Sequence, residues 1–156
     1  MKKKDKKGYT LVEMIIYISL IVIIMVAVVG IVIAVMKSGK YVGALNEIEN
    51  SAILSLNRIS REIRIASSAT LLNSSNINFG TTTIYLNSGL GRIYIDDGSG
   101  PNPLTSSKVN VSRLFFTKIT STSSTAVRVE MTLSASSSDM YLSKDFNTTT
   151  VLRGTE

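Results

Sequence analysis

The sequence predicts an α+β protein in which one long N-terminal helix, about residues 9 to 66, packs on a C-terminal antiparallel β-sheet. Three observations predict this class. The run from Met14 to Met36 carries no charge. Apolar residues then recur every three or four positions as far as Ala66, and from Asn76 onward they recur every second position. These two periods belong to a helix and to strands, and one face of a sheet needs a cover that the helix supplies.

Residues 1–8 form a basic leader that ends at Gly8. It contains five lysines and Asp5, and it accounts for most of the net charge of +6. Without it, 12 Lys and Arg would stand against 10 Asp and Glu. Past Ser67, positive and negative charges are interspersed along the chain, which argues against a nucleic acid as partner.

Residues 9–36 are predicted to form a transmembrane or filament-core helix. The uncharged run would be about 35 Å long at about 1.5 Å per residue, enough to cross a hydrocarbon core of about 30 Å. It is too long for a cleaved secretory signal, and Val35-Met36-Lys37 is a poor cleavage site, so we expect it to remain in the protein. More lysines precede the run than follow it, which favours a cytoplasmic N-terminus and an extracytoplasmic C-terminal domain.

Residues 37–66 continue the helix as an amphipathic half, with one apolar stripe. Gly30, Gly39 and Gly43 each weaken a helix by about 1 kcal/mol relative to alanine, so we expect bends there. Arg58 precedes Glu62 by four residues and can pair with it. The stripe consists of Leu45, Ile48, Ala52, Leu56, Ile59, Ile63 and Ala66.

Residues 67–156 are predicted to form a β-rich globular domain of short strands. Asn87 to Gly91 is typical of a hairpin turn, and Asp96 to Pro101 of a longer loop. The strand candidates are Ile77–Phe79, Thr83–Leu86, Arg92–Ile95, Val109–Val111, Leu114–Ile119, Ala126–Leu133, Met140–Leu142 and Thr148–Leu152.

The composition points away from an enzyme. The chain has no cysteine and no histidine, which excludes disulfides, thiol or imidazole catalysis and a zinc site built on these ligands. Serines and threonines are abundant, but none has a general base beside it, and we expect no cofactor. Asp96, Asp97 and Asn102 are a candidate Ca²⁺ site in one loop, although their spacing fits no EF-hand and Asp-Gly is ordinary turn chemistry.

Glu13 is the one carboxylate at the start of the apolar helix. A charge inside a bilayer costs at least about 2.5–3.5 kcal/mol, and such residues are usually functional. A simpler interpretation, without a specific function, places Glu13 at the membrane interface, where the N-terminal end of a helix favours a carboxylate. If cleavage created a new amine at Tyr9, that cation could pair with Glu13 of a neighbouring chain and neutralise both charges.

The segment Lys6-Lys7-Gly8-Tyr9-Thr10-Leu11-Val12-Glu13, followed by the apolar run, resembles the class III signal of type IV pilins and type II secretion pseudopilins. The resemblance implies that a membrane prepilin peptidase cuts between Gly8 and Tyr9 and methylates Tyr9. It also implies that Glu13 pairs with the N-terminal amine of a neighbour during assembly. Tyr9 replaces the usual phenylalanine, Gly30 stands where many major pilins have a kinking proline, and the frequent C-terminal disulfide is absent.

Two further segments, Leu56 to Arg64 and Phe146 to Arg153, resemble J-type minor pseudopilins and W-type minor pilins. The sequence therefore predicts a non-enzymatic minor subunit of a type IV pilus or type II secretion pseudopilus, held in the inner membrane by one span before it enters the filament. Its partners would be other pilins or pseudopilins, the prepilin peptidase and the inner-membrane assembly platform. The alternative is a membrane-anchored adhesive or DNA-uptake (competence) pilin whose sheet binds a ligand.

Overall fold

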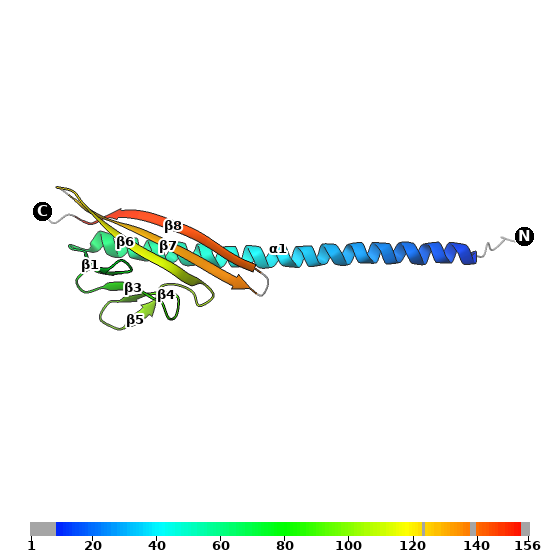
Figure 1. The fold of residues 1–156 in the computed structure, drawn as a ribbon, viewed down its shortest axis with the longest axis horizontal. Helices are drawn as coiled ribbons and strands as arrows, with labels where there is room; N and C mark the ends of the chain where they lie inside the picture. Colours follow the sequence, from blue (N-terminus) through cyan, green and yellow to red (C-terminus); the bar gives the residue numbers. More distant parts are fainter. Residues whose placement is uncertain (1–8, 123, 138–139, 154–156) are drawn as a thin grey trace, which may run out of the picture. The chain divides into compact units, whose positions relative to one another are not determined.

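The computed structural model describes residues 9–122, 124–137 and 140–153. The chain divides into two compact units, residues 1–40 and 41–156. Helix α1 (Leu11–Ile65) comes first, and the strands β1 to β8 follow it in the described part of the second unit (Figure 1). The predicted α+β class, with a long apolar N-terminal helix and antiparallel strands, is confirmed.

The strands form two antiparallel sheets, where the sequence alone suggested one. One sheet has five strands in sequence order, and the other has three. The five-stranded sheet consists of β1 (Thr70–Asn73), β2 (Asn76–Asn78), β3 (Thr83–Asn87), β4 (Arg92–Asp96) and β5 (Pro101–Pro103). The three-stranded sheet consists of β6 (Asn110–Thr120), β7 (Thr125–Ser137) and β8 (Met140–Val151).

The edge of β6 joins the two sheets through backbone hydrogen bonds. The Phe116 amide donates to the Ser74 carbonyl at 2.8 Å, and the Val111 amide donates to the Gly91 carbonyl at 2.7 Å. Gly91 has a φ of 59°, and a Cβ there would lie 1.6 Å from Oδ1 of Asn110. Only glycine satisfies both conditions, so this position is fixed by the junction.

Strand β6 contains a bulge that the sequence pattern concealed. We predicted two strands here, at Val109–Val111 and Leu114–Ile119. The register with β7 shifts between Val111 and Arg113, and one continuous strand results. The extra residue lets both Val111 and Leu114 face the core, three positions apart.

Strand β8 is also continuous, where we predicted two strands separated by a gap. Leu142 and Phe146 are partly buried against the core, and Lys144 lies between them. Lys144 interrupts the alternation of apolar residues along β8, which is why the sequence suggested a gap. Its ammonium forms an ion pair with Glu49 of α1 at 2.6 Å. Lys144 thus lies on the same face of β8 as Leu142 and Phe146, stays exposed itself, and pairs with the helix.

Strands β1 and β5 were not predicted. All four residues of β1 are exposed, so no alternation marks it. Strand β5 begins at Pro101, where the predicted loop ended, and it carries Pro101 and Pro103; proline is tolerated because β5 is an edge strand. The predicted hairpin at Asn87 to Gly91 is present, with Oδ1 of Asn87 accepting hydrogen bonds from the amides of Gly89 and Leu90.

The core of the second unit lies between α1 and the strands. The predicted stripe points into it: Ile48, Ala52, Ile59, Ile63 and Ala66 are buried, and Leu45 and Leu56 are partly buried. Strand β7 contributes an unbroken alternation of buried residues, Val127, Val129, Met131, Leu133 and Ala135.

Polar contacts also connect this half of α1 to its surroundings. The buried Ser55 hydroxyl donates to the Leu104 carbonyl at 3.0 Å, and the Thr150 hydroxyl donates to that of Ser60 at 3.2 Å. The expected pair between Arg58 and Glu62 is present at 3.0 Å. Helix α1 continues through its glycines without interruption, and the bends expected there stay a prediction.

Candidate functional site

The first turn of α1 is capped by Thr10. The Glu13 amide donates to the Thr10 hydroxyl at 3.3 Å, and the Met14 amide donates to the Thr10 carbonyl at 3.2 Å. Thr10 is therefore the N-cap residue and Glu13 is the third helical residue, the spacing of a capping box. Our sequence analysis missed this role, although the pattern Thr-x-x-Glu before an apolar run is a known signal for it.

Glu13 is partly buried in this first turn. Its carboxylate forms no hydrogen bond or ion pair with any residue that the structure describes. The positive end of the helix dipole favours its charge at this position. Tyr9 is 72% exposed, and its ring meets the Tyr17 ring edge-on at 6.5 Å. Gly8 and the rest of the predicted leader lie outside the described residues.

The helix behind Glu13 presents apolar side chains on every side. Its large apolar residues from Leu11 to Met36 are all about half exposed or more. Among the described residues α1 is the one helix long and apolar enough to cross a membrane. Its polar Ser19 is satisfied internally, because the hydroxyl donates to the carbonyls of Ile15 and Ile16 at 3.0 and 2.9 Å.

A capped apolar helix with one carboxylate in its first turn is thus followed by a β-rich unit. Residues 3–36 match the family model described as the prokaryotic N-terminal methylation motif. The chain therefore carries a pilin-type class III signal, which supports its placement in the type IV pilin and pseudopilin family and its processing by a prepilin peptidase. That family consists of structural subunits that are generally non-enzymatic. No curated protein and no solved structure matches the chain.

The loop after β4 holds the carboxylates of the candidate Ca²⁺ site. Oδ1 of Asp96 accepts a hydrogen bond from the Gly98 amide at 3.0 Å. Oδ1 of Asp97 accepts from the hydroxyl and the amide of Ser99, at 2.6 and 3.2 Å, and these bonds lower the pKa of Asp97 below its usual 3.8. Asn102 lies beyond the turn, and its side-chain amide donates to the Gly100 carbonyl at 3.3 Å. Both carboxylates thus support the turn itself, and a bound Ca²⁺ stays a prediction.

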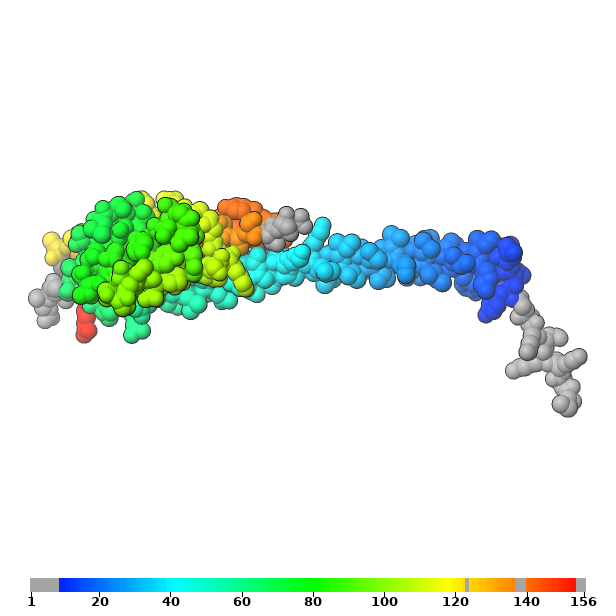
Figure 2. Space-filling model, turned by 90° about the horizontal axis from the view of Figure 1, so that it is seen from below, coloured from blue at the N-terminus to red at the C-terminus, as the bar shows by residue number. Residues whose placement is uncertain are grey.

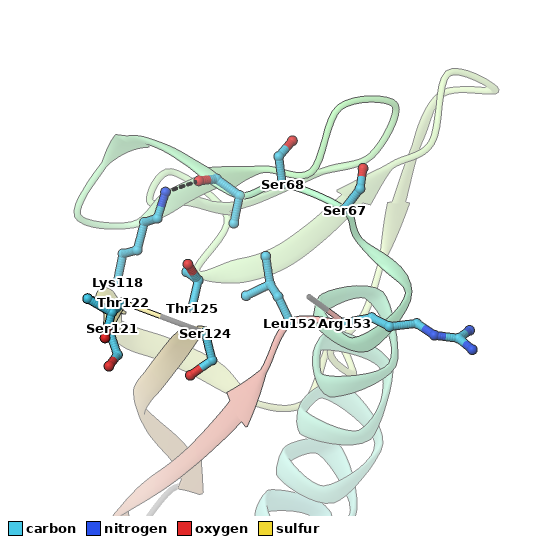
Figure 3. Close-up of a pocket in the computed structure, with 10 residues that line it drawn as sticks. Ser67, Ser68, Lys118, Ser121, Thr122, Ser124, Thr125, Leu152 and Arg153 are labelled. Carbon is cyan, nitrogen blue, oxygen red and sulfur yellow. Dashed lines mark hydrogen bonds between the residues drawn. The ribbon is translucent and has the colours of Figure 1, made fainter. Parts of the chain in front are cut away.

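A cavity of about 290 Å³ opens beside the C-terminal end of β8 (Figure 3). The Lys118 ammonium donates to the Ala69 carbonyl at 2.9 Å, and Arg153 extends away from the other lining side chains. The lining residues are Ser67, Ser68, Ala69, Lys118, Ser121, Thr122, Ser124, Thr125, Leu152 and Arg153. Among the described residues, this lining has no carboxylate or imidazole that could serve its hydroxyls as a general base.

Proposed function

We propose that this chain is a minor pilin or pseudopilin subunit, which a prepilin peptidase processes and which then joins a type IV pilus or a type II secretion pseudopilus. The observation that supports it most strongly is the methylation motif at residues 3–36, which coincides with the capped start of α1. The minor role rests on the resemblance of two segments, at residues 56–64 and 146–153, to minor subunits.

Processing would occur between Gly8 and Tyr9. The helix begins at Leu11, so Tyr9 and Thr10 precede it and are exposed. Exposed residues outside the helix next to the cut are what a peptidase needs. Cleavage removes the basic leader and leaves Tyr9 with a new amino group, which the same enzyme would methylate.

Glu13 would bind the methylated amine of Tyr9 in a neighbouring subunit. In a bundle of apolar helices water is excluded, so an unpaired carboxylate and an unpaired ammonium are each costly. Pairing them satisfies both and fixes the axial offset of adjacent helices. The Thr10 cap supports this arrangement because it holds the Glu13 backbone at a defined place in the first turn.

The membrane would hold the subunit before assembly. The lysines of the leader favour a cytoplasmic N-terminus, so the β-rich unit would lie on the extracytoplasmic side. An inner-membrane assembly platform would then extract the subunit, and the apolar surface of residues 11–36 would exchange lipid for neighbouring helices.

Mass spectrometry of the mature protein tests the processing step. We expect an N-terminus at Tyr9 that carries one methyl group, and an unprocessed chain in the variant G8V. A mature protein that begins at Met1, or near Lys37, contradicts the proposal.

Substitution Glu13→Ala tests the assembly step, with Glu47→Ala as the matched control because Glu47 is a half-exposed carboxylate that pairs with Lys108 at 3.0 Å. We expect E13A to be processed, folded and retained in the membrane, yet absent from sheared filaments, while E47A is incorporated like the native chain. Equal incorporation of both variants would show that Glu13 is not needed for assembly. A filament in which this chain is the most abundant subunit would contradict the minor role.

A further inference from the structure

Strand β8 is a long edge strand whose free side has no partner in the described part of the chain. It lies at the end of the three-stranded sheet and pairs with β7 along its whole length, without a register shift (Figure 1). With 12 residues it is about twice as long as an average strand. An unpaired edge of this length is a template for another strand.

The hydrogen-bond pattern shows which backbone groups of β8 face that free side. The Leu152 amide, directly after the strand, donates to the Thr125 carbonyl at 2.8 Å, and hydrogen-bonded pairs alternate along an antiparallel ladder. The even-numbered residues of β8 therefore bond to β7, and the odd-numbered ones direct both amide and carbonyl outward. These donors and acceptors extend over about 34 Å, at about 3.4 Å per residue. The outward residues are all exposed: Tyr141, Ser143, Asp145, Asn147, Thr149 and Val151.

The other edges of the two described sheets are either blunted or already used. The register of the short strand β1 shifts between Leu71 and Asn73, and β5 has a proline at each end. The edge of β6 bonds to Ser74 and Gly91. The five-stranded sheet, coloured green to yellow-green, lies on the face of the second unit that Figure 2 shows. Natural proteins protect their edges by such devices, so the open edge of β8 is the exception.

The lysine of β8 does not protect this free edge. The Lys144 ammonium pairs with Glu49 of α1 at 2.6 Å and lies 5.7 Å from the centroid of the Phe146 ring. Both contacts hold the ammonium toward the helix, on the inner face of the sheet. Asp145 is the other charged residue of β8, and it belongs to the outward set. A partner strand with a lysine or arginine opposite Asp145 would therefore be favoured.

The helix beside β8 leaves an apolar side chain uncovered. The flank of α1 that β8 follows is marked by Glu49, which pairs with Lys144. It is also marked by Ser60, whose hydroxyl accepts a hydrogen bond from Thr150 at 3.2 Å. Ile53 lies four residues after Glu49 and seven before Ser60, so it shares this flank, yet it is 54% exposed. A strand added to β8 would extend the sheet over Ile53 and cover it.

The direction of β8 argues against a second copy of this chain as the partner. From its contact with Glu49 to its contact with Ser60, β8 runs in the same direction as α1. Antiparallel pairing of two β8 strands would therefore make their helices antiparallel as well. Helices that enter one membrane from the same side cannot be arranged in this way, and parallel pairing is less stable per residue. A strand of a different chain, running opposite to β8, fits better.

We propose that β8 binds an extended strand of a different pilin-type subunit by antiparallel β-augmentation. In this mode the backbone hydrogen bonds give affinity, and the alternating side chains of the added strand give specificity. The expected segment has an apolar residue toward Ile53 and a basic residue near Asp145. The inference rests on the proposed function, because that function places both chains in one membrane, and it adds a contact outside the apolar helix.

Crosslinking from β8 in membranes of the native cells tests the pairing. The chain has no cysteine, so the variants S143C and T149C can each carry a short photo-crosslinker at a single site. We expect both to reach one segment of another subunit that carries a methylation motif of its own. The residue reached from position 143 should follow the residue reached from position 149, as antiparallel pairing requires. N102C, on the blunted edge β5, is the control and should not reach this segment.

Proline at an outward position tests the role of the backbone. Asn147→Pro removes an amide that faces the free side, so β8 should keep its bonds to β7, whereas Asn147→Ala removes only the side chain. We expect N147P to lower the crosslink yield from T149C about tenfold, because strand pairing is lost, and N147A to leave the yield unchanged. Circular dichroism shows whether N147P is folded, and the crosslink map of S143C and T149C stays decisive if it is not.

Three results would overturn the proposal: crosslinks to a second copy of this chain, no crosslinked protein segment, or equal yields in folded N147P and N147A. The N-terminus is read from the same mass spectra, which separates this inference from the proposed function. Mature chains that begin at Tyr9 but give no crosslinks would contradict the strand pairing alone. Crosslinks on chains that keep Met1 would contradict the processing and leave the pairing in place.

Discussion

The two halves of α1 differ in what surrounds them, although they share one helix. Ile23, in the first half, is 69% exposed, and its apolar neighbours are exposed on every side. Ile59, in the second half, is 0% exposed, and its face of the helix is covered by strands. The first half of the helix is covered by no other described element, while the second half is part of a core.

The difference shows that two parts of one helix can suit two different environments. A helix that is apolar all round needs a membrane or other helices as its solvent, whereas an apolar stripe needs only one packed layer. The same substitution should therefore act on insertion or assembly in the first half and on folding in the second half.

The largest effect is expected from Ile59→Ala. Removing a buried isoleucine side chain costs about 2–5 kcal/mol in unfolding free energy, since a cavity remains in the core. Urea unfolding of the full chain in detergent, followed by circular dichroism, measures it. Leu54→Ala is the matched control in the same helix, because Leu54 is 67% exposed, and it should change stability by less than about 0.5 kcal/mol. Equal losses of stability in the two variants would contradict the conclusion that the Ile59 face of the helix is packed in the core.

Next comes Ile23→Lys, which acts on the other half. A lysine at the centre of a membrane span costs about 2.5–3.5 kcal/mol on the insertion scale, so we expect a lower membrane-inserted fraction. A fractionation assay with a reporter on the β-rich unit measures that fraction. Leu54→Lys should insert like the native chain, and full insertion of I23K would show that this half needs no lipid.

A smaller effect is expected from Thr10→Ala. Loss of an N-cap costs about 0.5–2 kcal/mol, and the loss should be confined to the first turn of α1. Hydrogen exchange of the Glu13 amide measures this fraying, since that amide donates to Thr10. Thr10→Ser keeps the hydroxyl acceptor, so its Glu13 amide should exchange like that of the native chain. Unchanged exchange in T10A would show that Thr10 does not cap the helix.

The ion pair between Lys144 and Glu49 should contribute less still. Both side chains are more than a third exposed, so water screens the pair and a double-mutant cycle should give about 0.2–1 kcal/mol. The coupling should fall further at high salt. A coupling above that range would show that the inward position of Lys144 shields it more than its exposure indicates.

The smallest effect is expected from Asp97, and it concerns how stability depends on pH. Its pKa is lowered in the fold, so the carboxylate favours the folded state at neutral pH, and that contribution is lost as the pH falls from about 3.8 through the lowered value. Asp97→Asn should remove this part of the acid dependence of unfolding. An unchanged acid profile would contradict the hydrogen bonds from Ser99.

Much of the fold follows from local chemistry. The uncharged run, the stripe that contains Ile59 and the alternation through Val127, Val129 and Met131 each express a period that one segment displays alone. The signal at Lys6 to Glu13 is equally local, because it is one contiguous run of the sequence. These features could be predicted from the sequence because nothing distant changes them.

The tertiary structure decided the rest. The bulge in β6 depends on pairing with β7, and the inward Lys144 depends on Glu49 of the helix, nearly a hundred positions away. Two sheets form, and the β6 edge joins them through its bonds to Ser74 and Gly91. The free edge of β8 likewise exists only through strand order, which places β8 at the end of its sheet. Periodicity determines each element, but register and long-range pairing determine which side chains meet.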